Sequence, residues 1–132
     1  MEVQILTLCD NAQEYNGKLV VVGAFNQINA PLYPSVIPEM SIVAHLSFAE
    51  EDNGEHTITF GLTNETTGID IIKSEPYKQN IDMQGKNYAA NVNFVVKAPN
   101  FLVPNEGRYI LYVDVDGHRI QSTIYAGIVK PK

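Results

Sequence analysis

The sequence predicts an all-β protein, and the clearest indication is a hairpin in the last third of the chain. Asp116-Gly117 fits a two-residue type I′ turn, which requires positive φ at both central residues. Because side chains alternate between the faces of a strand, this turn also fixes which residues share a face. We predict Val113 opposite Ile120, Leu111 opposite Ser122 and Tyr109 opposite Ile124 on the inner face, with Asp114 opposite Arg119 and Tyr112 opposite Gln121 on the outer face.

Three further segments alternate between apolar and polar residues, whereas no segment has the 3.6-residue period of an amphipathic helix. One-sided strands of this kind occur in antiparallel sheets that have one wet face, and two such sheets stack into a sandwich. We therefore predict an immunoglobulin-like antiparallel β-sandwich of about eight strands. The inward residues are Ile42, Ala44, Leu46 and Phe48, then Ile58, Phe60 and Leu62, then Ala90, Val92, Phe94 and Val96.

Runs of β-branched and aromatic residues, bounded by Gly, Asn, Pro and Asp, give the order of the strands. A further edge strand fits within residues 76–87. No repeat or change of composition divides the chain, so we expect residues 1–132 to form a single domain. The predicted strands are Glu2–Cys9, Lys18–Asn29, Ser41–Ala49, Glu55–Thr63, Ile69–Glu75, Tyr88–Ala98, Arg108–Val115 and His118–Val129.

Two segments carry apolar residues on both faces. In the first strand Val3 and Ile5 share one parity and Leu6 and Leu8 the other, which predicts that this strand bends or changes sheet partway. The run Leu19–Phe25 is apolar throughout, so we expect it at the centre of a sheet with a cover over its outer side. The glycine inside this run, Gly23, is expected to mark a bulge or a close approach of backbone.

The pattern Asn105-x-Gly107-x-Tyr109 fits a tyrosine corner, in which a tyrosine hydroxyl bonds to backbone a few residues upstream. Such a corner fixes a crossover between the two sheets of a sandwich. Leu111 stands where an immunoglobulin domain has its second cysteine, and the chain has no tryptophan. The pattern therefore predicts an immunoglobulin-like architecture rather than a true immunoglobulin domain.

The segment 30–38 contains three prolines separated by apolar residues. Proline cannot donate to a ladder, so we expect this segment to stay out of any central strand pairing and either to cap the core or to face a partner. Its candidate interaction residues are Leu32, Tyr33, Val36 and Ile37, extended by the outer face of Val20, Val22 and Ala24.

Composition and charge narrow the classes of partner. Nine basic against fifteen acidic residues give a net charge of −6, which repels a phosphate backbone. No apolar run is long enough to span a membrane. We therefore expect neither nucleic acid nor a membrane as a partner. The residues after Met1 lack the features of a signal peptide and Cys9 is the only cysteine, so we expect a cytoplasmic location.

The sequence offers no motif for catalysis, a cofactor or a metal ion. Its histidines, His45, His56 and His118, are predicted on an outward face, at a strand start and in a turn, which does not favour a shared zinc site. Cys9, at the end of an apolar strand, is expected to be a buried thiol rather than a nucleophile. The acidic run 50–55 lacks the spacing of a calcium loop, so we expect a solvated turn. We predict no enzymatic activity and no cofactor.

The leading functional prediction is a non-enzymatic protein-interaction or assembly module that binds another protein or itself. The apolar residues of the proline segment carry this prediction, because contiguous exposed apolar surface marks such sites. The alternative is a β-sandwich that binds a small molecule or a carbohydrate with tyrosines in a shared pocket. The tyrosines of that alternative are Tyr33, Tyr112 and Tyr125, of which Tyr112 and Tyr125 are expected on outer sheet faces.

Three blocks of the chain carry a resemblance to a known family. They are Leu8-Cys9-Asp10-Asn11-Ala12 through Asn16-Gly17-Lys18-Leu19 to Gly23-Ala24-Phe25, then Ala30-Pro31 with Pro34 and Pro38, and then Gly107-Arg108-Tyr109. Together they resemble a bacterial family of uncharacterised proteins, a domain of unknown function, over nearly the whole chain. The resemblance implies a small β-sandwich of bacterial origin and assigns no activity, substrate or catalytic residue.

Overall fold

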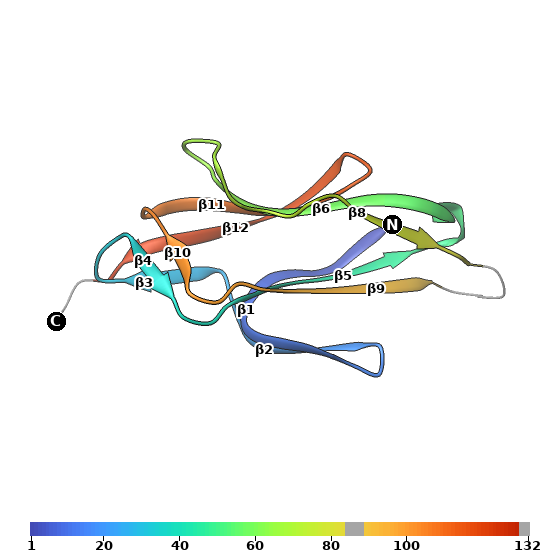
Figure 1. Ribbon diagram of the computed structural model, residues 1–132, viewed down its shortest axis with the longest axis horizontal. Helices are drawn as coiled ribbons and strands as arrows, with labels where there is room; N and C mark the ends of the chain where they lie inside the picture. Colours follow the sequence, from blue (N-terminus) through green and yellow to red (C-terminus); the bar gives the residue numbers. More distant parts are fainter. Residues whose placement is uncertain (84–88, 130–132) are drawn as a thin grey trace.

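The computed structural model describes residues 1–83 and 89–129, and this part of the chain is all-β (Figure 1). It contains twelve strands and one short 3₁₀ helix, η1 (Glu50–Asp52). The predicted all-β class is therefore confirmed, whereas the predicted number of about eight strands was too low. The additional strands are short segments of three to five residues, β3, β4, β8 and β10.

Four strands form the first sheet, in the order β2-β1-β5-β9, with antiparallel neighbours throughout. The first half of β1 pairs with β5 and its second half with β2. The pairing with β5 shifts register between Val3 and Ile5, so the predicted bend of this strand is present. The strands of this sheet are β1 (Glu2–Tyr15), β2 (Lys18–Phe25), β5 (Ser41–Phe48) and β9 (Ala90–Lys97).

The second sheet has the order β3-β12-β11-β6-β7, and β8 also pairs with β6. The strands β7 and β8 bond to successive parts of β6 and so form one edge of the sheet together. At the opposite edge β3 lies parallel to β12. The strands of this sheet are β3 (Gln27–Ala30), β6 (Gly54–Asn64), β7 (Asp70–Lys73), β8 (Tyr77–Ile81), β11 (Gly107–Val115) and β12 (His118–Ile128).

A separate two-stranded sheet joins β4 (Ser35–Ile37) to β10 (Phe101–Val103). From Pro31 onward, the proline segment thus stays out of both large sheets, as its prolines require. The predicted edge strand within 76–87 is β8. Residues 84–87 of that range, like Tyr88 at the start of a predicted strand, lie outside the described residues.

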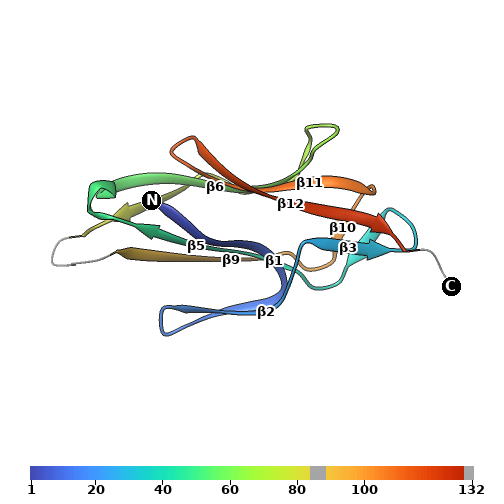
Figure 2. The same cartoon turned by 180° about the vertical axis from the view of Figure 1, so that it is seen from behind.

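The two large sheets face each other in a sandwich-like arrangement, which is seen edge-on in Figures 1 and 2. Apolar side chains of both sheets fill the space between them in two clusters. The predicted inward residues of β5 and β6 are buried, whereas those of the edge strand β9 are buried only at Ala90 and partly buried beyond it. Buried members include Leu8, Ile42, Leu62, Leu111 and Ile124 in one cluster, and Leu46, Phe48, Ile58, Phe60 and Val113 in the other.

The second half of β1 and the whole of β2 form a hairpin that folds beneath β5 and β9 as a further layer (Figure 1). Its turn, Asn16-Gly17, has φ of 50° and 76°. The hairpin covers the outer face of the first sheet, where Val43 of β5 is buried together with Cys9 and Ala12 of β1. Because of this layer, residues of β5 are buried on both faces of the strand. The alternating apolar pattern of its sequence indicated burial on one face only.

The prediction that Leu19–Phe25 lies at the centre of a sheet was wrong, because β2 is an edge strand. Its apolar residues on the two sides have different surroundings. Leu19 and Val21 pack towards the layer above, whereas Val20 and Val22 are 47% and 56% exposed. The predicted strand Lys18–Asn29 is also two strands, since the chain leaves the first sheet after β2 and enters the second as β3.

The hairpin of β11 and β12 has the predicted register at all five pairs, from Val113 opposite Ile120 to Tyr112 opposite Gln121. Asp116 and Gly117 have φ of 53° and 82°, as a type I′ turn requires. The hydroxyl of Tyr109 donates to the carbonyl of Asn105 at 2.7 Å, which is the contact of a tyrosine corner. Within residues 1–83 and 89–129, no helix has the length and apolar character needed to cross a membrane.

Candidate functional site

The four residues predicted as an interaction surface divide into two inward and two outward side chains. Tyr33 and Ile37 are partly buried against the core between the sheets. The Tyr33 hydroxyl donates to the carbonyl of Gly127 at 2.8 Å, which ties the proline segment to the end of β12. Leu32 and Val36 point outward and are 65% and 53% exposed. The segment therefore caps the core with one face and offers the other to solvent.

The exposed side of the proline segment includes one residue that the sequence analysis did not single out. Leu102 lies directly opposite Val36 in the two-stranded sheet and is also 53% exposed. Opposite residues of an antiparallel pair share a face, so these two side chains form one small apolar surface. Leu102 is far from the proline segment in the sequence, so the pattern of that segment alone did not predict its contribution.

Tyr112 is not available as a binding platform, although its predicted face is correct. Only 1% of the residue is exposed, because the guanidinium of Arg119 lies 3.7 Å from the ring centroid and the ring covers Gly61. A methyl group added at Gly61 would lie 2.2 Å from the Tyr112 hydroxyl oxygen. That hydroxyl also contacts Asp70 at 3.2 Å. Burial raises the pKa of the phenol, followed by the charge of Asp70, so the ring is held neutral.

The three tyrosines of the carbohydrate alternative have separate surroundings. Tyr125 is 47% exposed beneath Arg108, whose guanidinium lies 5.8 Å from its ring. Tyr33 faces the core and Tyr112 lies under Arg119. These contacts place the rings in three different environments instead of one pocket. The arrangement predicted for this alternative is therefore not the one observed.

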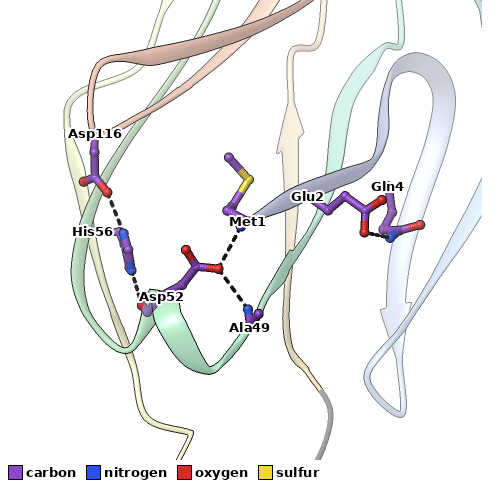
Figure 3. Close-up of polar contacts among 7 residues, drawn as sticks. All are labelled: Met1, Glu2, Gln4, Ala49, Asp52, His56 and Asp116. Atoms are coloured by element: carbon purple, nitrogen blue, oxygen red, sulfur yellow. Dashed lines mark hydrogen bonds and ion pairs between the residues drawn. The ribbon is translucent and has the colours of Figure 1, made fainter.

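A polar cluster connects η1, the start of β6 and the turn between β11 and β12 (Figure 3). Nδ1 of His56 lies 2.6 Å from the carboxylate of Asp116, and Nε2 contacts the backbone carbonyl of Asp52. Since both ring nitrogens face acceptors, the geometry favours the doubly protonated imidazolium. The carbonyl of Asp52 and then the carboxylate of Asp116 raise the pKa of His56. The contacts of His56 with Asp116 and Asp52, which we name the His56 clasp, connect chain segments that are far apart in sequence.

The acidic run 50–55 has a defined structure instead of being a purely solvated turn. The carboxylate of Asp52 accepts the backbone N–H of Ala49 at 2.9 Å and the amino group of Met1 at 2.7 Å. The hydrogen bond from the Met1 amino group, and then the one from the Ala49 N–H, lower the pKa of Asp52. In the part of the chain that the structure describes, acidic, histidine and cysteine side chains form no group of three that could hold a metal ion.

The remaining predicted chemical residues have structural surroundings. His45 contacts Asn93 across the β5–β9 pair, and His118 is exposed where β12 begins. Cys9 is fully buried beneath the hairpin layer, and burial raises the pKa of its thiol, with a further contribution from the neighbouring Asp10. A thiol with a raised pKa is a poor nucleophile at neutral pH.

A groove of about 1150 Å³ runs along the outer edge of β9, and we name it the β9 groove. One wall is the second half of β1, in the hairpin layer, and the other is the edge of the second sheet from β6 to β8. Strand β9 itself lies between these walls. The lining residues are Asn11, Ala12, Gln13 and Glu14 of β1, Phe60, Ser74, Glu75, Tyr77 and Gln79 of the second sheet, and Asn91 to Lys97 of β9.

The aromatic side chains of the β9 groove are in contact with one another. The ring of Phe94 lies 4.8 Å from that of Phe60 and 5.6 Å from that of Tyr77, measured between centroids. Tyr77 is half exposed and so presents this aromatic wall to the groove. On the other face of β9, the Asn93 amide donates to the carbonyl of Gly17 at 2.9 Å and lies 3.5 Å from a carboxylate oxygen of Glu14. One side of the groove is therefore aromatic, and the other, which we name the polar wall, is polar beside Asn91 and Asn93 and apolar beside Val95.

The backbone of β9 offers a row of hydrogen-bonding groups to the groove. β9 pairs with β5 on one side and with no other strand among the described residues. The amide of Ala98 donates to the carbonyl of Met40, and alternate residues of an antiparallel ladder bond to the same neighbour. Applied along β9, this alternation directs towards the groove the N–H and C=O groups of Asn91, Asn93, Val95 and Lys97.

The described residues thus form an all-β fold in which the outer edge of β9 pairs with none of the described strands and lies between two walls. Residues 4–125 match a family of unknown function (DUF6941), so the chain belongs to this family. The predicted resemblance to a domain of unknown function is confirmed, while the bacterial origin stays a prediction. Comparison with curated proteins and with solved structures gave no match.

The β9 groove was not predicted from the sequence. Its walls come from three segments, near residues 11–14, 60–79 and 91–97, and each looks like ordinary alternating strand when read alone. The one local signal is in β9, where the residues between the inward apolar positions include Asn91 and Asn93, which suits a wet outer face. That this face meets a second wall depends on the hairpin layer.

Proposed function

We propose that this protein is a non-enzymatic interaction module that binds an extended segment of another protein by adding it as a strand to the outer edge of β9. The observation that carries the proposal is the row of unpaired N–H and C=O groups directed into the β9 groove. Strand addition at an exposed sheet edge is a recurring mode of peptide recognition. Main-chain hydrogen bonds supply affinity, and the walls beside the edge supply specificity.

Features of β9 that protect edge strands elsewhere are missing, which supports the proposal. Natural edge strands are blunted by prolines, bulges or charges in the middle of the strand. β9 contains no proline, pairs with β5 in continuous register and carries its one charged residue, Lys97, at its end. The two walls of the groove replace those devices, because they leave room beside β9 for a strand while hindering the approach of a whole sheet.

A second candidate function is the binding of a small polar ligand such as a carbohydrate in the same groove. Tyr77 and the amides of Asn11, Gln13 and Asn91 favour it, since sugars bind to aromatic faces and amide groups. This candidate uses none of Tyr33, Tyr112 and Tyr125. It predicts contacts to side chains, whereas strand addition predicts dependence on the backbone of β9.

Single substitutions at Asn91 separate these two functions. Its N–H points to the groove, so Asn91→Pro removes a donor for the incoming strand without removing a bond to β5. Asn91→Ala is the matched control, because it removes the side chain and keeps the N–H. The probe is a displayed library of random nine-residue peptides, selected on the wild-type protein and then assayed as single peptides on both variants.

We expect the selected peptides to bind Asn91→Pro at least about tenfold more weakly and Asn91→Ala within about twofold of wild type. Thermal unfolding of both variants checks that they are folded. Selected peptides that bind Asn91→Pro as well as wild type would contradict strand addition. A library that yields no binder, with a sugar array that does and is sensitive to Asn91→Ala, would support the second candidate instead.

The exposed side chains of Leu32 and Val36, with Leu102, remain a second proposed contact surface, for a partner protein or another copy of the chain. A cytoplasmic location, supported by the single cysteine, and a bacterial origin, supported by the resemblance, are also parts of the proposal. None of these depends on the β9 groove.

A further inference from the structure

We infer that the β9 groove selects extended segments in which apolar residues alternate with basic residues. The inference rests on the proposed function, and it adds the chemical class of the partner segment. A strand added to β9 continues the pleat of the sheet, so its side chains alternate between the same two faces. Successive side chains of the bound segment therefore contact the two walls of the groove in turn.

The aromatic wall contacts every second side chain of the bound segment. Val92, Phe94 and Val96 of β9 project to this side, where they pack with the core between the sheets. The side chains of an added strand on this face lie next to Phe94 and Tyr77, whose rings are already in edge-to-face contact. Apolar side chains are favoured here, because they extend an existing aromatic cluster and remove its exposed edge from water.

The polar wall contacts the remaining, alternate side chains of the bound segment. Asn91 and Asn93 project to this side in the first half of β9, whereas Val95 further along packs with Ala12 and Val43. Gln13 and Glu14 belong to the β1 wall. The Glu14 carboxylate lies near the amide of Asn93, close to the middle of β9. A basic side chain of the partner at this position gains an opposite charge and neutral hydrogen-bond acceptors. An acidic side chain there would meet a like charge.

The charged residues of the groove lining also favour a basic partner segment. The lining holds two acidic residues, Glu14 and Glu75, one on each wall, against one basic residue, Lys97, at the end of β9. The chain as a whole carries a net charge of −6. Both the local and the overall charge favour a cationic segment and disfavour an anionic one. The basic residues are expected beside the first half of β9, away from Lys97.

Defined peptides test this inference. The probes are three capped, fluorescently labelled nine-residue peptides in which valine alternates with lysine, valine alternates with glutamate, or serine alternates with lysine. Binding to the full chain is measured by fluorescence anisotropy. We expect the valine–lysine peptide to bind at least about tenfold more tightly than either of the others, since one lost charge pair or apolar face weakens binding by about that factor.

Charge variants locate the effect. Glu14→Gln is expected to lower the preference for the valine–lysine over the valine–glutamate peptide by about threefold or more, and Glu14→Lys to reverse it. Glu51→Gln is the matched control, because Glu51 is an exposed glutamate outside the groove lining, and it should leave the preference within about twofold. The preference should also decline as salt is raised.

The outcomes distinguish the inference from the proposed function. Equal binding of the valine–lysine and valine–glutamate peptides, lost from both in Asn91→Pro, would overturn the inferred selectivity and leave strand addition in place. Binding of the valine–lysine peptide that Asn91→Pro does not weaken would overturn both. A preference for the valine–lysine peptide that Glu14→Lys does not change would also overturn the inference, because the charge pair would then lie elsewhere.

Discussion

Among the described strands, β2 and β9 form the two edges of the first sheet, and they differ in how regular their ladders are. β2 is interrupted at Gly23, where φ is +68° and a methyl group would lie 2.3 Å from the carboxylate of Asp10. β9 pairs with β5 over all eight of its residues and lies between two walls. An edge whose ladder is broken by a residue at positive φ is a poor template for another strand, whereas a regular edge inside a groove accepts a single one. The difference shows that walls beside a sheet edge can hinder pairing with another sheet and still leave the edge able to pair with a single strand.

The largest expected effect comes from the point where the β2 hairpin leaves the sheet. Leu8 is fully buried and lies opposite both Phe25 of β2 and Ile42 of β5. Leu8→Ala removes packing from both pairs, and we expect the free energy of unfolding to fall by about 2–5 kcal/mol in urea titrations. The folded fraction should still bind peptides at β9. A loss below about 1 kcal/mol would mean that the hairpin is anchored elsewhere.

The next effect tests the break in the β2 ladder at Gly23. Gly23→Ala combines backbone strain at positive φ with overlap against Asp10, so we expect a loss of about 2–4 kcal/mol in the free energy of unfolding. Gly68→Ala is the matched control, since Gly68 has φ of +71° and open space around it, and only strain of about 1–2 kcal/mol is expected there. Equal losses for the two variants would show that the close approach of Asp10 adds nothing.

The contacts of His56 with Asp116 and Asp52 predict a pH dependence of the free energy of unfolding. The pKa of His56 is raised above its usual 6.5, so its stabilisation is complete below that value and is lost as pH rises through the raised pKa. The pKa of Asp116 is lowered from 3.8 by the backbone N–H of Thr57 and then by His56, so its contribution is present above 3.8 and is lost as pH falls through the lowered pKa. Urea unfolding at about pH 5.5 and about pH 8 should show the wild type weaker at the higher pH.

His56→Gln is the matched variant for this pH dependence, because it keeps a polar side chain and removes the titration. We expect it to flatten the decline between the two pH values. Peptide binding at β9 should not follow this titration, since His56 is not part of the groove lining. A wild-type decline that His56→Gln leaves unchanged would assign it to another group.

The smallest effect is expected at the exposed apolar surface of the proline segment. Val36→Ser changes a side chain that is mostly in water, so the free energy of unfolding should change by no more than about 0.5 kcal/mol. Binding at β9 should be the same as in wild type. If Val36→Ser instead weakened peptide binding, the difference between the two edges would not account for the binding site.

The sequence predicted the strands whose turns are local, and it failed where the deciding contact was distant. The register of β11 and β12 follows from Asp116-Gly117, since two residues determine the turn and the alternation does the rest. The break between β2 and β3 at Asn26 has no glycine or proline to mark it. Its cause is the parallel pairing of β3 with β12, which local patterns do not encode.

The same reason explains what was missed at the candidate site. The predicted residues Leu32 and Val36 are exposed, as an interaction surface requires, but the groove along β9 depends on how the hairpin layer folds under the sheet. That fold-back needs Val43 and Val95 to be covered from outside, and each looks like an unremarkable apolar residue in its own strand. Burial of a second sheet face is a property of the assembled layers.

The parallel pairing of β3 with β12 also has a consequence for folding kinetics. Gln27 lies opposite Tyr125, a separation of 125 − 27 = 98 residues, whereas β1 with β2 and β11 with β12 are adjacent hairpins. Closing so long a loop has a high entropic cost before any contact offsets it. We therefore expect both hairpins to form early and β3 to dock late, so that until then β12 is a transient aggregation-prone edge of the folding intermediate.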